Sequence, residues 1–440
     1  MSDKFEVVRD PLWNTIRLDP TAVDIIDTPE FQRLRHVRQL GLAYLVYPGA
    51  THTRFDHALG VYHLARRALG ILSERGELEG IDEVECALIP YAALLHDIGH
   101  YPFSHAVEEL DTGRVPEHHE ALTPEFLRAP QLRAILEKVD PEAPDRIASM
   151  IQGRSDSPLQ GLVSGSLDLD KIEYLNRDAT FCGVPYGIVD VDRLIHALTI
   201  LRDPVTGRAE IGIHGKGLSA LESLLFAKYQ MFRNVYWHHA VRAATALYKR
   251  LVQDAIDARI IKSAELIGRS DEGLLALIEE RARGRDDDIT RSVRDRWLPA
   301  LRERKLPKRA VEISGELFRE SPIESWFYDD DAMVRRFEDR LADELELDSG
   351  SVFLDYPIKP HMMGLDLLLD RGEGVQRLTE AGWAGLIDLP RVADELYHSA
   401  RVLRIFTTVR RDIDANSIIP LLRLTPRDIE KRLSDSTPLL

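Results

Sequence analysis

The sequence predicts a mainly α-helical protein with a β-hairpin in its helical part and a smaller α/β lobe after it. Apolar residues recur at helical spacing through most of residues 15–126. Residues 196–214 instead contain two short apolar runs around a turn with proline and glycine, which is typical of a hairpin. From about residue 265, charged helical segments alternate with short apolar strands. We therefore expect one domain at residues 1–264 and a second at residues 265–440.

Composition limits the class of protein and its partners. The 440 residues suffice for two or three packed units at about 150 residues each. Hydrophobic residues make up 44% and charged residues 30%, as in soluble globular proteins. The formal net charge of -16 argues against a nucleic-acid partner, because nucleic-acid-binding surfaces carry a basic excess. The two cysteines, Cys86 and Cys182, cannot build a disulfide framework or a cysteine-based zinc site.

No pattern in the sequence indicates a membrane protein. The first residues, MSDKFEVVRD, lack the apolar core of a signal peptide. No run of about eighteen apolar residues occurs, and a membrane-spanning helix needs one. We therefore expect a cytoplasmic protein without a membrane partner.

Three segments of the first helical region have clear helical patterns. FQRLRHVRQLGL and FDHALGVYHLARRALGIL place apolar residues at helical spacing, so we expect a helix in each. ECALIPYAALLHDIGH is apolar almost throughout, which predicts a buried central helix. Gly99 and Pro102 are expected to end it near a group of histidines. His100 lies four residues after His96, so the two can share one face of this helix.

Another helix is predicted over SGSLDLDKIEYLNRD, residues 164–178. The segment begins with Ser and Asp residues and continues at helical period, which is typical of a helix N-terminus. Asp170, Tyr174 and Asp178 are spaced by four and therefore share one face of this helix.

The remaining elements follow the hairpin. A long helix is expected from Ser219 toward Arg242, with Ser219 and Glu222 as a capping box. Short strands are expected at VEISGEL, SVFLDYPI, LDLLLD and VLRIFTTV. Two acidic triplets, Asp286–Asp288 and Asp329–Asp331, lack the spacing of a calcium loop, so we expect solvated loops there rather than cation sites.

Two histidines and two aspartates form the strongest candidate for a metal site. A lone buried histidine is more often a hydrogen-bonded core residue than a ligand. The pair His96–Asp97 is different, because a carboxylate at the end of an apolar helix stays unpaired unless a cation meets it. Together with His57 and Asp170, the pair suits one divalent transition metal such as Fe, Mn, Co, Ni or Zn. Four protein ligands leave positions for water and substrate oxygens, as a hydrolytic site requires.

Further polar residues surround these four in the sequence. His100, His105, His118 and His119 are candidate general acids and bases, because imidazole titrates near neutral pH, and Glu108 lies among them in the sequence. The alternative is that several of these side chains only orient the metal ligands from behind. Lys171 directly follows Asp170 and suits a phosphate oxygen, although a lysine alone is more often a solvated surface residue.

The ordered motifs of the first 260 residues resemble a known family. FQRLRHVRQLG, YPGATHTRFDHALGV, LLHDIGHYPFSH, HHE and DLDKIEYLNRD occur in this order and are similar to the motifs of HD-domain phosphohydrolases. A bare His-Asp pair is weak evidence, whereas the ordered set is specific. The most similar branch is the deoxynucleoside triphosphate triphosphohydrolases, which include the SAM-and-HD-domain enzyme. No SAM domain is expected before the first motif.

The resemblance implies a helical HD-domain core that hydrolyses deoxynucleoside triphosphates to deoxynucleosides and inorganic triphosphate. It implies metal ligation by His57, His96, Asp97 and Asp170. It implies water activation or leaving-group protonation by His100, His105, Glu108 and His119, with His118 the weaker partner because the family places His directly before Glu. It implies substrate binding by Gln39, Leu40, Arg54, Lys171, Tyr174, Asp178, Arg233 and Tyr236.

The resemblance also implies partners and regulation. Family members form homo-oligomers, as tetramers or dimers, and a nucleotide such as dGTP activates some of them. Positions that match the activator site are Asp27, Gln32, Arg35, Val46 and Tyr47. A family lysine aligns with Glu6 and an asparagine with Arg9, and the acidic replacement should weaken phosphate binding there. Mg²⁺ is expected to arrive with the nucleotide.

Two alternatives remain open at the level of sequence. The same HD chemistry can act on another nucleotide, such as a monophosphate, a cyclic nucleotide or an alarmone. The chain can instead be a nucleotide-sensing regulator without turnover, although the complete ligand set and the acidic charge argue against that.

Overall fold

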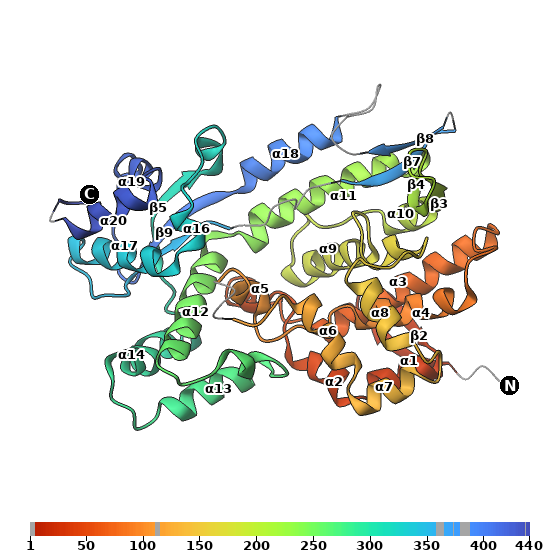
Figure 1. Cartoon of the computed structure of the whole chain (residues 1–440), viewed down its shortest axis with the longest axis horizontal. Coiled ribbons are helices and arrows are strands. Elements are labelled where there is room, and N and C mark those ends of the chain that lie inside the picture. Colours follow the sequence, from red (N-terminus) through yellow and green to blue (C-terminus); the bar gives the residue numbers. More distant parts are fainter. Residues whose placement is uncertain (1–4, 111–114, 358–364, 373, 379–387, 436) are drawn as a thin grey trace.

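The computed structural model is mainly α-helical, which confirms the predicted class (Figure 1). Helices form most of the molecule, and three small sheets lie around them. The two termini lie at opposite ends of the molecule (Figure 1). The described residues are 5–110, 115–357, 365–372, 374–378, 388–435 and 437–440.

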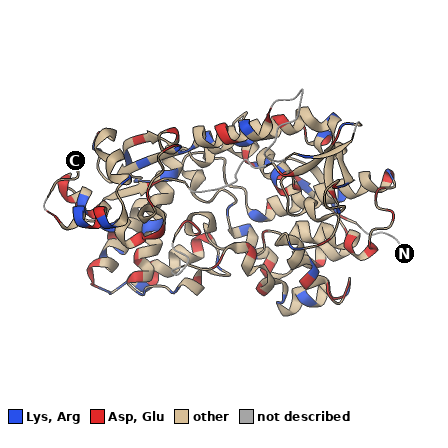
Figure 2. Ribbon diagram, turned by 45° about the horizontal axis from the view of Figure 1, so that its top comes forward, with Lys and Arg blue, Asp and Glu red and all other residues tan. Residues whose placement is uncertain are grey.

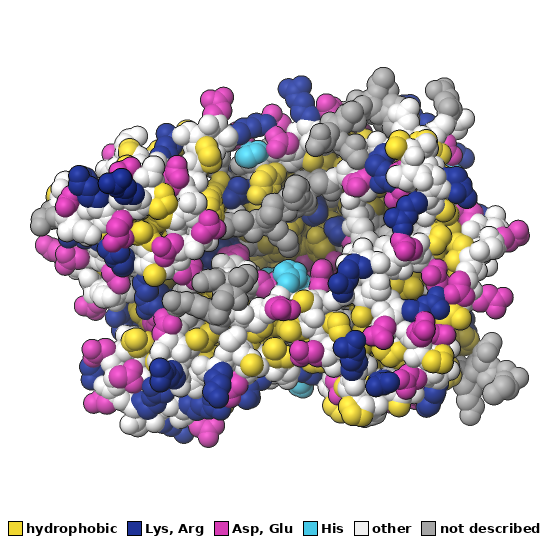
Figure 3. Space-filling view, viewed as in Figure 1, with side chains coloured by type: hydrophobic (Ala, Val, Ile, Leu, Met, Phe, Trp, Pro, Cys, Tyr) yellow, Lys and Arg dark blue, Asp and Glu magenta, His cyan; other side chains and the backbone are white. Residues whose placement is uncertain are grey.

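Charged side chains are spread over the whole molecule (Figure 2). On the face shown in Figure 3, acidic and basic side chains alternate over both ends. The centre of this face is hollowed, with a histidine side chain at the rim of the hollow (Figure 3). Within the described residues, no helix combines the length and the apolarity that crossing a bilayer requires.

The elements follow in chain order. The first part of the chain contains β1 (Glu6–Asp10), β2 (Asn14–Leu18), α1 (Pro20–Ile26), α2 (Pro29–Gln32), α3 (Arg54–Glu74), α4 (Glu83–Leu95), α5 (Ser104–Val107), α6 (His119–Leu127), α7 (Pro130–Leu136), α8 (Ala143–Ile151), α9 (Leu169–Cys182) and α10 (Val191–Ala197). The middle contains β3 (Leu198–Arg202), β4 (Ala209–His214), α11 (Leu218–Met231), α12 (His239–Asp257), α13 (Asp271–Ala282), α14 (Asp288–Arg291) and α15 (Leu298–Arg302). The last part contains β5 (Lys308–Ser314), α16 (Trp326–Asp329), α17 (Asp331–Glu344), β6 (Val352–Asp355), β7 (Leu367–Asp370), β8 (Val375–Leu378), α18 (Leu389–Ala400), β9 (Val402–Thr407), α19 (Ala415–Leu422) and α20 (Pro426–Ser434).

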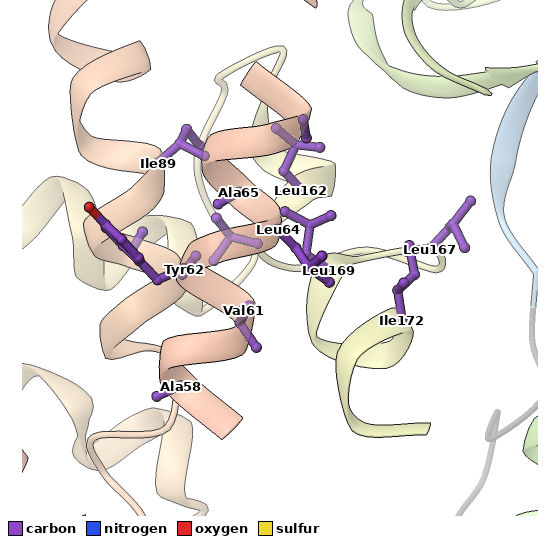
Figure 4. Close-up of a cluster of buried hydrophobic side chains, with 14 of the residues drawn as sticks. Ala58, Val61, Tyr62, Leu64, Ala65, Ile89, Leu162, Leu167, Leu169 and Ile172 are labelled. Atoms are coloured by element: carbon purple, nitrogen blue, oxygen red, sulfur yellow. The ribbon is translucent and has the colours of Figure 1, made fainter. Parts of the chain in front are cut away.

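The helical core is centred on α3. Its apolar side chains lie between those of α4 and α9, as Figure 4 shows for Ala65 and Leu64 beside Ile89 of α4 and Leu169 of α9. All four of these side chains are fully buried. Burial of this kind contributes about 25 cal/mol per Å² of apolar surface, so the core holds the ends of these three helices in fixed relative positions.

The predicted hairpin is confirmed and belongs to a larger sheet. Strands β3 and β4 pair antiparallel, with Leu198 opposite Ile213. Strand β7 pairs parallel with β4, and β8 pairs antiparallel with β7. The sheet therefore takes strands from both sides of residue 265. Leu367 and Leu369 of β7 join the same buried cluster as the helices of the first part.

The C-terminal strands are also confirmed, with one addition. The four strands expected from the sequence appear as β5, β6, β7 and β9. Strand β9 lies between β5 and β6 and pairs antiparallel with both. The sequence did not predict β8, nor the N-terminal hairpin of β1 and β2.

Several expected helix boundaries were wrong. Residues 31–42 do not form one helix: α2 ends at Gln32, and two 3₁₀ turns follow. Helix α4 ends at Leu95, so His96 and His100 do not share a helix face. Helix α11 begins at Leu218 without a side-chain cap, so Ser219 and Glu222 form no capping box.

The helix expected toward Arg242 is interrupted. Helix α11 passes into a π-helical turn at Phe232–Tyr236, and α12 starts anew at His239. The acidic triplets serve as helix starts, because Asp287 caps α14 and Asp330 caps α17. The expectation of loops at both triplets was therefore wrong in part, because α14 begins at Asp288 and α17 at Asp331.

Candidate metal centre and active site

Three helix ends meet at the candidate metal centre. His57 lies in the first turn of α3, which Thr53 starts with a capping box. His96 and Asp97 directly follow α4. Asp170 lies in the first turn of α9. The packing of α3 against α4 and α9 therefore brings all four predicted metal ligands together.

The donor atoms of these residues converge on one point. His57 Nε2 lies 3.1 Å from His96 Nε2 and 3.0 Å from Asp170 Oδ1. His96 Nε2 lies 3.4 Å from Asp97 Oδ1 and 3.6 Å from Asp170 Oδ1. Two imidazole nitrogens and two carboxylate oxygens thus face one another across a few ångströms.

The hydrogen bonds behind the two histidines fix which nitrogen faces this point. His57 Nδ1 lies 2.6 Å from Glu173 Oε2, and His96 Nδ1 lies 2.9 Å from the carbonyl oxygen of Ala93. Because both partners accept, both Nδ1 atoms donate, and Nε2 of each ring faces the shared point. Two imidazole nitrogens beside two carboxylates at these distances need a cation between them, either a proton or a metal ion. The donor set therefore fits a divalent metal, and nitrogen with oxygen ligands suits a transition metal.

The charged groups of the site stabilise one another. Burial disfavours an ionised Asp97, but Arg54, His96 and His100 hold its pKa well below the ordinary value. Burial also opposes a charged His57, yet Asp170 and Glu173 raise its pKa to about 10. The site thus retains a proton when it holds no metal, and a metal that binds must displace that proton.

Glu173 is a functional residue that sequence reasoning missed. Its side chain is fully buried, and its Oε1 accepts from Trp13 Nε1 at 3.0 Å and from Arg177 Nε at 2.7 Å, while Oε2 holds His57. Gly60 makes room for it, since a Cβ there would lie 2.0 Å from Glu173 Oε1. Only its position three residues after Asp170 marked it in the sequence, and that position alone does not reveal the link to His57.

The four predicted acid–base residues form a second cluster beside the first. His100 Nε2 lies 3.0 Å from Asp97 Oδ1, which connects the two clusters. The rings of His100 and His119 stack at 3.5 Å. Glu108 Oε1 lies 2.8 Å from His119 Nδ1, and its Oε2 lies 3.4 Å from His105 Nδ1. The structure therefore brings all four together.

A side-chain hydrogen bond and two backbone features hold this second cluster in place. Ser104 Oγ lies 2.6 Å from His100 Nδ1. Phe103 adopts a left-handed conformation with φ of 51°, which costs energy in a residue other than glycine. Gly99 lets the turn approach α6, since a Cβ there would lie 2.1 Å from the carbonyl oxygen of His119. Burial lowers the pKa of His119 to about 4, so its ring is neutral near pH 7.

Three residues predicted to contact the sugar, Asp178, Tyr174 and Tyr236, lie together next to the metal centre. With His52 they form one side of the site, which we call the wall. Asp178 Oδ2 accepts from Tyr236 Oη at 2.6 Å, and Asp178 Oδ1 lies 2.7 Å from His52 Nε2. The rings of Tyr174 and Tyr236 meet edge to face at 6.4 Å. His52 is fully buried and was not predicted, although it lies in the motif YPGATHTR two residues before Arg54.

Gln39 and Leu40 lie next to this wall. The backbone N–H of Gln39 donates to the carbonyl oxygen of His52 at 3.1 Å. Within the described residues, the buried atoms Gln39 Oε1 and His52 Nδ1 have no hydrogen-bond partner. Leu40 is half-buried and packs against the small buried cluster of Ala43, Ala50 and Val241.

The predicted phosphate ligands differ in their placement. Arg54 NH1 donates to Asp97 Oδ2 at 2.6 Å, so it lies at the metal centre. Lys171 Nζ donates to Asp168 Oδ2 at 2.5 Å and to the carbonyl oxygen of Gly165 at 2.8 Å, one residue from the ligand Asp170. Arg233 lies apart: it is exposed and donates to the Tyr229 hydroxyl at 2.6 Å.

The candidate activator residues occupy two places. Arg35 Nε donates to Gln32 Oε1 at 2.9 Å, and Asp27 is exposed at the end of α1 nearby in the chain. Val46 and Tyr47 instead pack against a small buried cluster that includes Val241 of α12. The structure therefore pairs Gln32 with Arg35 and places the two apolar residues with α12.

Comparison with known proteins is consistent with this site. The HD domain family matches residues 54–164, and the HD associated region matches residues 189–384. The chain is 32% identical over 379 residues to the uncharacterized protein MJ1154 of Methanocaldococcus jannaschii, which covers 85% of this chain and 74% of that protein. It is 30% identical over 267 residues to human deoxynucleoside triphosphate triphosphohydrolase SAMHD1, which covers 54% of this chain and 42% of the human protein.

The fold is similar to that of a solved structure over nearly its full length. A hypothetical protein from Aquifex aeolicus superposes with a TM-score of 0.68 and 27% sequence identity, covering 92% of this chain and 97% of that one. The HD match includes His57, His96 and Asp97, and the second match begins shortly after Asp170. The chain therefore belongs to the family of HD-domain phosphohydrolases that carry an HD-associated region.

Proposed function

We propose that this protein is a metal-dependent deoxynucleoside triphosphate triphosphohydrolase. The observation that carries the proposal is that two features lie side by side. One is a His₂Asp₂ donor set, and the other is the wall, in which Asp178 forms hydrogen bonds with Tyr236 and His52. The first suits hydrolysis of a phosphate ester, and the second suits a sugar hydroxyl. The resemblance to the human enzyme, whose name states this activity, supports the choice of substrate.

Four residues would hold the metal: His57, His96, Asp97 and Asp170. When bound, a divalent transition metal lowers the pKa of a water and polarises a phosphate oxygen. Glu173 and the carbonyl of Ala93 keep the two imidazoles in the ligating tautomer.

We assign proton transfer to the second cluster, which consists of His100, His105, Glu108 and His119. Water adds to the α-phosphorus, the bond to O5′ breaks, and the departing 5′-oxygen takes a proton. His119 is suited to take a proton from the attacking water at Nε2 and pass it to O5′, because Glu108 accepts from its Nδ1 and leaves Nε2 as the acceptor. Arg54, 3% exposed, and Lys171 supply positive charge for the triphosphate that remains.

We assign recognition of the sugar to the wall around Asp178. Asp178 is an acceptor for a 3′-hydroxyl, and the unpartnered Gln39 Oε1 is a second acceptor nearby. The tyrosine rings at positions 174 and 236 limit the space beside the sugar, which disfavours a 2′-hydroxyl. Arg233 is proposed as a further phosphate ligand, which requires it to leave the Tyr229 hydroxyl.

Regulation and assembly complete the proposal. A nucleotide such as dGTP would bind with Mg²⁺ near Asp27, Gln32, Arg35, Val46 and Tyr47, and the chain would assemble as a homotetramer or dimer. The bond between Gln32 and Arg35 supports part of this site.

A product assay tests the proposed reaction. Purified protein is incubated with each dNTP and with Mn²⁺, Fe²⁺, Co²⁺, Ni²⁺ or Zn²⁺, with and without dGTP, and inorganic triphosphate is measured. His96→Ala and Asp170→Ala should lose both bound metal and turnover, whereas His196→Ala, an exposed histidine on α10, should keep both. Absence of triphosphate under every condition contradicts the proposal. Turnover of monophosphates or cyclic nucleotides alone would establish the alternative HD substrate.

A further inference from the structure

A buried ionic junction joins three parts of the chain that are far apart in sequence. The two terminal nitrogens of Arg242 each donate to one carboxylate oxygen of Glu109 at 2.8 Å. The same guanidinium donates to Asp355 through Nε at 2.9 Å and through NH2 at 2.5 Å. Arg242 is 4% exposed and Asp355 1% exposed. Lys249 Nζ adds a further bond to Glu109 at 3.1 Å.

The three partners belong to functionally different elements. Glu109 directly follows Glu108 in residues 99–110, which we call the catalytic segment because it carries His100, His105 and Glu108. Arg242 lies in the first turn of α12. Asp355 ends β6 in the C-terminal sheet. Helix α12 contacts both α5 and β6, so it lies between the catalytic segment and that sheet (Figure 1).

The other attachments of the catalytic segment to α12 are mostly apolar. The Phe103 ring lies 4.6 Å from the Tyr248 ring, and Val107 and Leu110 share a buried cluster with Leu247 of α12. Apolar packing is not directional, whereas a bidentate guanidinium–carboxylate pair fixes direction as well as distance. The junction is therefore a directional contact between α12 and the residue next to Glu108.

Such a junction is not needed for stability alone. A buried ion pair is often no more stabilising than apolar residues of similar size, because both charges lose water. Burial opposes the charge on Glu109, yet Arg242 and Lys249 lower its pKa to about 2, so the junction stays ionised at neutral pH. Its contribution is a defined geometry at one end of the catalytic segment.

We propose that Arg242 is a positioning residue through which β6 holds the catalytic segment in its working orientation. The proposal rests on the proposed function, since it assigns Glu108 and the neighbouring histidines to proton transfer. It makes the C-terminal sheet part of the hydrolytic machinery: a change at Asp355 reaches the site through Arg242 and Glu109.

Arg250 offers a matched control on the same helix. It is also 4% exposed, and its guanidinium binds a buried carboxylate, Glu338 of α17. Removal of either arginine leaves a buried carboxylate without its partner. Arg242→Gln and Arg250→Gln should therefore lose comparable stability in thermal unfolding, and of these two arginines Arg242 is the one bonded to the catalytic segment.

The decisive measurement separates kcat from KM. Arg242→Gln should lower kcat about 10- to 100-fold, because a displacement of about 1 Å at catalytic groups has effects of that size. KM and bound metal should change little, since the metal ligands do not touch the junction. Arg242→Lys should recover stability but not kcat, because an ammonium cannot form two parallel pairs. Asp355→Asn should lower kcat several-fold although it is far from the reacting atoms in the chain.

Hydrogen exchange of residues 99–110 gives a readout that needs no substrate. Exchange should quicken in Arg242→Gln and Asp355→Asn and stay at the wild-type rate in Arg250→Gln. Equal loss of kcat in Arg242→Gln and Arg250→Gln, or unchanged exchange in all three, would overturn the proposal. If the wild type hydrolyses no dNTP, the proposed function fails, and the exchange data still decide whether the junction orders the catalytic segment.

Discussion

Each metal-site histidine is held from behind by an acceptor that motif spacing does not reveal. His57, His96, Asp97 and Asp170 were predictable because their ordered motifs combine residue types that suit a metal. Glu173 was not predictable, because its bond to His57 spans 116 positions and depends on how α3 packs on α9. The ligands are thus marked in the sequence, and the residue that orients them is fixed only by tertiary structure.

Replacement of Glu173 by glutamine tests this orienting role. Gln keeps the shape but is a weaker acceptor for His57 Nδ1–H, so we expect metal affinity to fall about 10- to 100-fold. Metal binding is measured by competition with a chelator of known affinity. Glu338→Gln is the control, since Glu338 is also a buried carboxylate bonded to an arginine. The same loss of metal affinity in both variants would contradict the orienting role.

His52 is the second residue that the motifs did not single out. His52 forms a hydrogen bond with Oδ1 of Asp178, and Tyr236 forms one with Oδ2. The His52 ring lies 4.6 Å from the Phe181 ring. His52→Phe retains the aromatic packing and removes the hydrogen bond. We expect KM for dNTPs to rise about tenfold, in line with about 1.4 kcal/mol for one lost hydrogen bond to a charged group.

Steady-state kinetics on a dNTP and the matching ribonucleotide measure this effect. Tyr236→Phe removes the other bond to Asp178 and should shift KM in the same direction. A His52→Phe protein whose KM equals that of the wild type for both nucleotides would show that substrate binding does not depend on the hydrogen bond between His52 and Asp178.

At the scale of elements, helical periodicity predicted α3 and α4 but failed between residues 31 and 42. That segment has the same apolar spacing, yet it must turn so that Gln39 N–H reaches the carbonyl oxygen of His52 and Arg38 pairs with Thr53. Tertiary contacts thus override local propensity where a segment lines the site. The π-helical turn at Phe232–Tyr236 is a similar case, because it carries Tyr236 to Asp178.

The start of α13 provides a pH-dependent prediction. Asp271 is 1% exposed, and burial raises its pKa to about 6 even though Arg38 N–H donates to it at 3.0 Å. The folded state therefore binds this proton more tightly than the unfolded state, whose pKa is about 3.9. Stability from this group is present at low pH and is lost as pH rises through 6.

Asp271→Asn removes this dependence. Relative to the wild type, the variant should gain about 2 kcal/mol in free energy of unfolding between pH 4.5 and 7.5, since one pKa unit corresponds to about 1.4 kcal/mol. Urea unfolding at several pH values gives the difference directly, and carboxylates common to both proteins cancel. A difference that is constant with pH would show that Asp271 ionises normally in the folded protein.

At the scale of the whole molecule, the net charge of -16 does not oppose a triphosphate. Acidic and basic side chains are mixed along the ribbon (Figure 2), while Arg54 lies at the candidate metal centre and Lys171 follows the candidate ligand Asp170 in the chain. A small anion responds to the nearest charges, because charges more than about 8–10 Å away are largely screened by salt. A polynucleotide would instead need a continuous basic surface.

The sheet formed by β3, β4, β7 and β8 joins strands from both sides of residue 265. Compositional change at residue 265 predicted a separate lobe, but composition does not reveal that β7 returns to pair with β4. Leu369 of β7 is fully buried among the side chains that also surround α3 and α9. We therefore expect damage in β7 to weaken the metal-binding helices as well as the C-terminal part.

Leu369→Ala tests this dependence. The cavity should lower the free energy of unfolding by about 2–5 kcal/mol, whereas Leu317→Ala, at a residue that is 52% exposed, should change it by less than about 0.5 kcal/mol. Native-state hydrogen exchange then shows which segments lose stability. Faster exchange in α3 and α9 together with β7 is expected, because all three share one buried cluster. Faster exchange confined to residues after 265 would mean that the two parts unfold independently and that β7 only covers the hairpin.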